Sequence, residues 1–199
     1  MESAIKREML RHFLAALAYR TQKALRGAPQ DFAEFAAGNE VRTPHELICH
    51  MRSVLGYART FFIGGNYPHP VPGNFDADVQ AFHEMLEDLS QRPAAGDELE
   101  NITEEQLLRG PFSDAMTHAG QLAMLRRLHR EPVASENFIF ANITPSNLTH
   151  NQPEPAKPDT DWSDPGFGDA KEQIGKVDIR VIPTCHFSVW NLCGAVQLN

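Results

Sequence analysis

The 199-residue sequence has few cysteines and no long apolar run, and each shortage excludes a class of protein. Its three cysteines, Cys49, Cys185 and Cys193, form an odd set without regular spacing, which disfavours a disulfide scaffold and favours a reducing compartment. No stretch approaches the roughly 18 consecutive apolar residues of a membrane-spanning helix. The apolar run near the N-terminus lacks the cleavage site of a signal peptide. We therefore expect a cytoplasmic protein that does not bind membranes.

Positive charge is also scarce, since 18 Lys and Arg residues against 26 Asp and Glu residues give a formal net charge of -8. An acidic surface repels phosphate backbones, so binding to nucleic acid is not expected. The chain also lacks a G-x-S-x-G motif, a phosphate-binding glycine loop and a C-x-x-C pair. Nine histidines are many for this length, and on count alone they fit metal chemistry and unrelated structural histidines equally well.

Apolar periodicity predicts helices through residues 1–133 and therefore an all-α fold, a four-helix bundle. The second helix begins at a capping box formed by Thr43 and Glu46 and ends before Gly64. A second capping box, Thr103 with Gln106, precedes a break at Pro111. The predicted helices cover about residues 3–25, 44–63, 75–90 and 111–130. On the first of them, the spacing predicts an inward face of Ile5, Met9, His12, Phe13, Ala16, Leu17 and Arg20.

Residues 134–199 are rich in proline and aspartate, and we expect them to form an irregular arm that packs on the bundle. Its first part should pack through Phe138, Ile139, Phe140 and Ile143, and β-branched residues near the C-terminus indicate one or two short strands. The acidic stretch 158–169 departs from the calcium-loop pattern. The spacing of Cys185, His186 and Cys193 matches no usual zinc site.

One carboxylate and one imidazole interrupt the apolar face of the fourth predicted helix. Asp114 and His118 lie four residues apart, so their side chains share a face that also carries Leu122. Burying an unpaired carboxylate or imidazole is costly. A divalent metal would satisfy both groups, with oxygen from Asp114 and nitrogen from His118. A direct Asp–His hydrogen bond would also satisfy them, so the pair leaves both interpretations open.

His50 supplies a third inward polar group, from the flank of the apolar arc on the second helix. His45 is expected to point to solvent, and Cys49 to be a packing residue. Two imidazoles and a carboxylate on facing helices would form an N2O ligand set with an open position, typical of a catalytic metal site. Three residues are expected around it: Gln121 outside the ligand set, orienting a ligand or the substrate, and Arg20 and Tyr57 as weaker candidates for the pocket rim.

The stretch "TPHELICHMRSVLGYARTFF", followed after a long connection by "DAMTHAGQLAMLRRLHREPV", resembles the DinB/YfiT-like superfamily over about residues 1–133. The resemblance implies a four-helix bundle with a long crossover between the second and third helices. It also implies metal ligation by His50 and by His118, the second member of a pair that precedes Gly120 and Gln121. Asp114 stands where family members carry the first histidine of that pair, so the metal and its retention stay open.

Two functions follow from these observations. The first is a metal-dependent enzyme with His50, Asp114 and His118 as ligands for a divalent ion, zinc or nickel. The resemblance implies a transferase, isomerase or hydrolase that acts on a small molecule with the help of a low-molecular-weight thiol, and it implies a homodimer. The alternative is a metal-free bundle that serves as a dimeric binding or interaction module, with its polar residues paired among themselves.

Overall fold

The computed structural model describes residues 2–155, and within them it contains helices and no strands, which confirms the all-α prediction. The long helices are α1 (Glu2–Leu25), α2 (Pro44–Ile63), α3 (Phe75–Ala95) and α5 (Ser113–Leu128). The short ones are η1 (Gln30–Glu34), α4 (Glu104–Leu107), the π turn η2 (Leu108–Phe112) and η3 (Phe138–Phe140). The expected strands, the acidic stretch and the Cys185, His186 and Cys193 set lie outside the described residues. Among residues 2–155, no helix is long and apolar enough to cross a bilayer.

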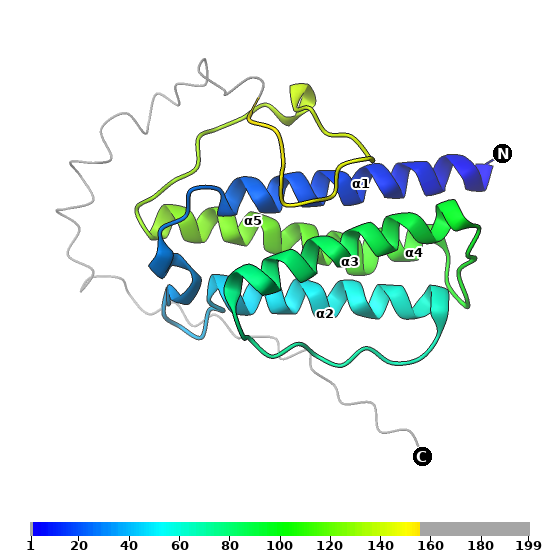
Figure 1. Cartoon of the computed structure of the whole chain (residues 1–199), viewed down its shortest axis with the longest axis horizontal. Helices are drawn as coiled ribbons and strands as arrows, with labels where there is room; N and C mark the ends of the chain where they lie inside the picture. The colour runs from blue at the N-terminus through cyan, green and yellow to red at the C-terminus, as the bar shows by residue number, and fades with distance from the viewer. Residues whose placement is uncertain (1, 156–199) are drawn as a thin grey trace, which may run out of the picture. The chain divides into compact units, whose positions relative to one another are not determined.

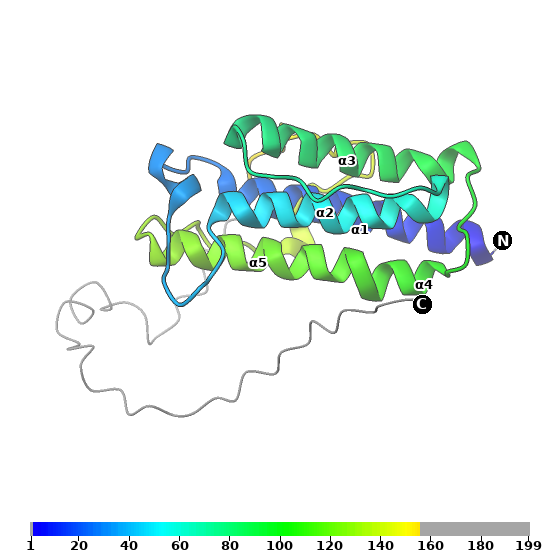
Figure 2. The ribbon, with the colours of Figure 1, turned by 90° about the horizontal axis from the view of Figure 1, so that it is seen from below.

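The long helices pack side by side, and each contacts two neighbours in the cyclic order α1, α3, α2, α5 (Figure 1). α2 and α3 run in the same direction, because residues 64–74 return along the length of α2 before α3 begins (Figures 1 and 2). We call residues 64–74 the crossover. A parallel pair of helices requires such a long connection. The crossover therefore lies against the outside of α2 and becomes part of its surroundings.

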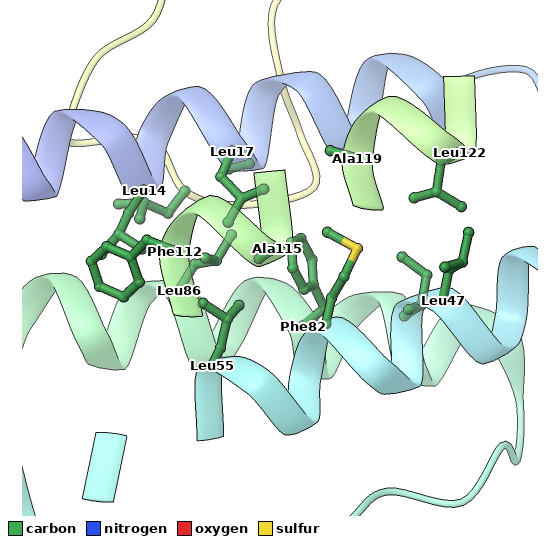
Figure 3. Packing of buried hydrophobic residues seen from close by; sticks show 14 of the residues in the cluster. Leu14, Leu17, Leu47, Leu55, Phe82, Leu86, Phe112, Ala115, Ala119 and Leu122 are labelled. Atoms are coloured by element: carbon green, nitrogen blue, oxygen red, sulfur yellow. The ribbon is translucent and has the colours of Figure 1, made fainter. Parts of the chain in front are cut away.

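Leucine, phenylalanine and alanine side chains from all four long helices meet in one core (Figure 3). The predicted apolar arc of α2 is confirmed, since Leu47, Met51, Leu55 and Ala58 are buried. The predicted inward face of α1 is largely wrong, since Ile5 and Met9 are 59% and 68% exposed and His12 and Arg20 are exposed as well. Leu17 is buried as expected, but it packs together with Leu10, Leu14 and Ala18. α1 carries apolar residues in both phases, so spacing alone could not select the buried one.

Local signals predicted most helix ends. In both capping boxes the threonine hydroxyl accepts a hydrogen bond from the backbone N–H three residues on, and the Glu46 or Gln106 side chain accepts one in return. α3 continues to Ala95 and not to the predicted Ser90, although Pro93 lies within it. A proline in the last turn removes only one backbone donor. Gly96 ends the helix in the left-handed conformation, with φ of 91°.

The predicted break at Pro111 is a kink. Gly110 has φ of −94° and ψ of −109°, outside the helical region, and the π turn η2 surrounds it. The Ser113 hydroxyl donates to the Leu108 carbonyl at 2.6 Å, and the Ser113 backbone N–H also donates to this carbonyl. Single π turns inside helices frequently occur at functional sites. The kink lies immediately before Asp114.

The described part of the arm, residues 134–155, is anchored by polar contacts as well as apolar ones. The Glu136 carboxylate is buried and accepts hydrogen bonds from the Tyr19 hydroxyl at 2.6 Å and the Lys23 ammonium at 2.7 Å. Leu148 is buried in the core, and the His83 imidazole lies with Nδ1 2.6 Å from its carbonyl oxygen. The expected burial of Ile139 and Phe140 is wrong, since they are 85% and 53% exposed.

His83 makes stability depend on pH. Burial lowers the pKa of His83 from 6.5 to about 4, although the hydrogen bond to Leu148 opposes this shift. The unfolded chain therefore binds the proton first, and stability present above pH 6.5 is lost as the pH falls toward 4. We expect this group to account for about 3 kcal/mol of that loss. Urea denaturation of His83→Gln at a series of pH values should show a correspondingly smaller loss.

His12→Gln is the control for removing an exposed imidazole from α1. If the His83→Gln and wild-type stability curves fall in parallel between pH 6.5 and 4, this assignment is wrong.

Candidate functional site

The predicted residues His50, Asp114 and His118 come together between α2 and α5. His118 Nε2 lies 3.6 Å from Asp114 Oδ1, and His50 Nε2 lies 3.9 Å from Asp114 Oδ2. The two imidazole rings meet edge to face, with 4.7 Å between centroids. One ligand atom from each residue falls within 4.8 Å of the other two. Both carboxylate distances exceed a hydrogen bond, so the three groups converge without satisfying one another. We call them the His50 group.

His118 is the buried member of this group, and it lacks one partner. Its Nδ1 lies 2.7 Å from Gln121 Oε1, and because that oxygen only accepts, Nδ1 carries the proton. Nε2 therefore has a free lone pair, and it is buried without a hydrogen-bond partner among residues 2–155. Such an atom costs about 1–3 kcal/mol. A metal-binding histidine has the same arrangement, with one nitrogen on the metal and the other donating to a nearby oxygen.

Asp114 differs from the prediction, which placed it on the buried face of its helix. Its side chain is 50% exposed, whereas Ala115, His118, Ala119, Leu122 and Leu125 form the buried face of α5. Asp114 thus occupies the edge of that face, in the first turn after the kink. The carboxylate lines a pocket of about 680 Å³ that also includes Tyr57 and Arg109. The group is therefore buried at His118 and open at Asp114.

His50 is half-buried, and its pKa lies below the ordinary histidine value. Burial is the main cause, followed by the positive charge of Arg42 and by the neighbouring His118, while Asp114 acts in the opposite direction. A lowered pKa keeps the imidazole neutral near pH 7, with a nitrogen lone pair available. The neutral form is the one that ligates metals.

Two contacts fix the crossover against α2 beside the His50 group, and a third fixes its end to α3. The Tyr67 ring packs onto Gly56 so closely that a Cβ atom there would lie 2.1 Å from it. His69 Nδ1 lies 2.9 Å from the Ser53 hydroxyl, and the Gly73 N–H donates to Asp78 at 3.0 Å. These contacts hold the His69 ring 6.5 Å from that of His50. Sequence reasoning missed His69, because nothing in a proline-rich connection indicates which helix it covers.

A second polar group lies on another side of α2, where His45 was expected to reach solvent. That expectation is wrong, since His45 is buried and its Nε2 lies 2.7 Å from Asp78 Oδ2. The first residues of α3 and the turn η1 cover this side of α2, with Glu34 Oε1 3.3 Å from His45 Nδ1. Cys49 is buried beside them, which agrees with its expected packing role. His45, Cys49 and Asp78 also bring their ligand atoms within 4.8 Å of one another.

This second group does not require a metal. Asp78 already accepts hydrogen bonds from Arg52 and the Gly73 N–H, so its negative charge has a cation partner. Burial acts to raise the pKa of Asp78, but the bonds from His45 and Gly73 and the charge of Arg52 outweigh it and lower that pKa. Burial and then Asp78 raise the pKa of the Cys49 thiol to about 11, so the thiol keeps its proton. His118 Nε2 therefore favours the His50 group as the metal site.

Of the two residues expected at the rim, Tyr57 lines the pocket beside Asp114. The guanidinium of Arg20 instead lies 3.8 Å from the Phe138 ring centre, under the arm. Gln121 contacts His118 as described above. No family model, curated protein or solved structure matches the chain.

The close packing of Tyr67 on Gly56 gives a testable consequence. Gly56→Ala should destabilise the protein by about 1–3 kcal/mol, because the ring or the crossover must move to admit the methyl group. Replacing Tyr67 with alanine as well should recover part of that loss. Gly120→Ala on α5 is the matched control, since a Cβ there meets no atom within 4 Å. Equal stabilities for the two single variants, measured by urea denaturation, would show that the contact does not hold the crossover.

Proposed function

We propose that this protein is a metal-dependent enzyme that binds a divalent cation through His50, Asp114 and His118 and acts on a small molecule. The observation that carries this proposal is the buried Nε2 atom of His118, which has a lone pair and no partner among the described residues. A cation shared with His50 and Asp114 would satisfy it. Two neutral imidazoles and one carboxylate suit zinc or nickel.

The arrangement of the helices supports a DinB/YfiT-like fold for residues 1–133. The long helices form a bundle in which α2 and α3 are parallel and joined by the crossover. The proposed ligands lie on the second and last of these helices, which are the positions that the resemblance implies. Asp114 stands where the family carries a histidine, so an anionic ligand replaces a neutral one at this position.

Three protein ligands leave a position for water or substrate, which is the pattern of a catalytic site. A divalent cation there would polarise a carbonyl group or favour the ionised form of a bound water or thiol. The chain's own residues prepare this chemistry. Gln121 accepts from His118 Nδ1 and so fixes the imidazole with Nε2 toward Asp114. Val54 and Tyr57 provide an apolar wall beside the carboxylate for the body of a substrate. The reaction is a thiol-dependent transfer, an isomerisation or a hydrolysis.

The alternative is a metal-free bundle that associates with a second copy through exposed apolar side chains. Several such side chains are on the surface: Ile5 and Met9 on α1, Met124 and Leu128 on α5, and Ile139 and Phe140 on the arm. This alternative leaves the Nε2 atom of His118 without a function. A homodimer is compatible with both proposals.

Metal content separates these proposals. Elemental analysis of the untagged protein, after dialysis against zinc or nickel and then buffer, should give about one ion per chain. His118→Ala, His50→Ala and Asp114→Ala should each lose it, because each leaves only two ligands. Cys49→Ala is the matched control, since Cys49 belongs to the second group of potential ligands.

Circular dichroism should show that every variant retains the helical fold. A wild-type protein without metal, or metal that is lost in Cys49→Ala and kept in His118→Ala, would exclude the proposed site.

A further inference from the structure

The pocket beside Asp114 is open to solvent and has the volume of a small-molecule site. Its volume of about 680 Å³ lies in the usual range of about 300–1,000 Å³ for ligand pockets. Ser53, Val54 and Tyr57 line it from α2, and Arg109 and Pro111 line it from the kink. Asp114 brings the His50 group to its edge. The pocket therefore places an apolar wall, one positive charge and one of the proposed metal ligands, Asp114, around one space.

Arg109 is the positive charge in this pocket, and it has no carboxylate partner among residues 2–155. Half of the twelve arginines among residues 2–155 form ion pairs with carboxylates, namely Arg7, Arg11, Arg26, Arg52, Arg59 and Arg92. Asp114 lines the same pocket but lies closer to the two histidines than to any arginine, with no ion pair to Arg109. The guanidinium is therefore free to receive an anion.

The kink explains why an arginine lies here. Gly110 leaves the helical conformation and Pro111 provides no amide donor, so α4 and α5 are joined through a π turn. The turn puts Arg109 and Asp114 on one pocket although they are five residues apart. At Gly110 a Cβ atom would meet nothing within 4 Å, so the wall of the pocket is open there. A ligand can therefore approach Arg109 and Asp114 together.

We infer that the substrate of this site carries a carboxylate or phosphate group, and that Arg109 binds this group while the reacting end lies at the His50 group. The inference rests on the proposed metal site. A divalent ion with two neutral histidines and one carboxylate has a net charge of +1, and Arg109 adds a second positive charge. A guanidinium binds carboxylate and phosphate oxygens through paired hydrogen bonds. Arg109 would thus select anionic molecules over neutral ones of the same shape.

Thiol probes bound to the cobalt-loaded full-length protein test this selection, because a thiolate on cobalt gives a charge-transfer absorption that reports binding directly. The probes are 3-mercaptopropionate and 6-mercaptohexanoate, each compared with the mercapto alcohol of the same chain length. The wild type should bind at least one acid about tenfold more tightly than its alcohol. This ratio corresponds to a difference in binding free energy of about 1.4 kcal/mol. Arg109→Gln should reduce this ratio to less than about threefold while cobalt binding is unchanged.

Two arginine variants serve as controls. Arg127→Gln removes an exposed arginine of α5 that also lacks a carboxylate partner in the described part of the chain, and it should keep the tenfold ratio. A second pocket is lined by Arg42, His50 and His69. Arg42→Gln removes the positive charge of that pocket, and it should also keep the tenfold ratio. Direct binding of the probe carboxylate to cobalt would contribute equally to the affinity ratio in every variant, so a comparison between variants removes this contribution.

The outcomes separate the two proposals. If the wild type does not bind cobalt, the proposed metal site fails, and the inference about Arg109 fails with it. If cobalt binds but neither acid is preferred, or the preference survives in Arg109→Gln or disappears only in Arg42→Gln, the metal site stands and the assignment of Arg109 is wrong.

Discussion

Polar atoms buried between helices need partners, and the rest of the site depends on how that need is met at His118. Its Nδ1 is bound by Gln121, while its Nε2 is buried without a hydrogen bond inside residues 2–155. His50 and Asp114 lie around this atom, but neither forms a hydrogen bond with it. Five other buried side-chain atoms among residues 2–155 also lack a partner, His83 Nε2 among them, but only His118 belongs to a group of three potential ligands. Burying this nitrogen without a partner costs free energy, and a cation bound by His50, Asp114 and His118 would remove that cost.

α2 carries polar groups on two sides, and their difference separates structure from proposed chemistry. His45 binds Asp78, which also holds Arg52 and the Gly73 amide, so these contacts close one side of α2 and anchor the end of the crossover. The other side carries His50, whose partners are incomplete and whose surroundings open into pockets. The His45–Asp78–Arg52 network ties α2 to the first turn of α3 and to the end of the crossover. A rigid surrounding of this kind keeps ligand side chains in place before a metal or substrate arrives.

Features that depend on neighbouring residues could be predicted from the sequence, and features that depend on distant ones often could not. Both capping boxes and the break at Pro111 are local, and the structure contains them. The convergence of His50 with Asp114 and His118 was also anticipated, from the four-residue spacing and from which helices face each other. The solvent-facing prediction for His45 failed because α3 and η1, remote in sequence, cover it. Likewise, nothing near Arg126 in the sequence indicates that it is buried and donates to carbonyls at and just after the end of α1.

The most direct test of this account is a crystal structure of the full-length protein soaked with zinc, with anomalous diffraction recorded at the zinc edge. The account predicts one strong anomalous peak in contact with His118 Nε2, His50 and the Asp114 carboxylate, with Gln121 still bound to His118 Nδ1. A structure in which those three side chains are ordered and no peak lies among them would contradict the account. So would a peak found only among His45, Cys49 and Asp78.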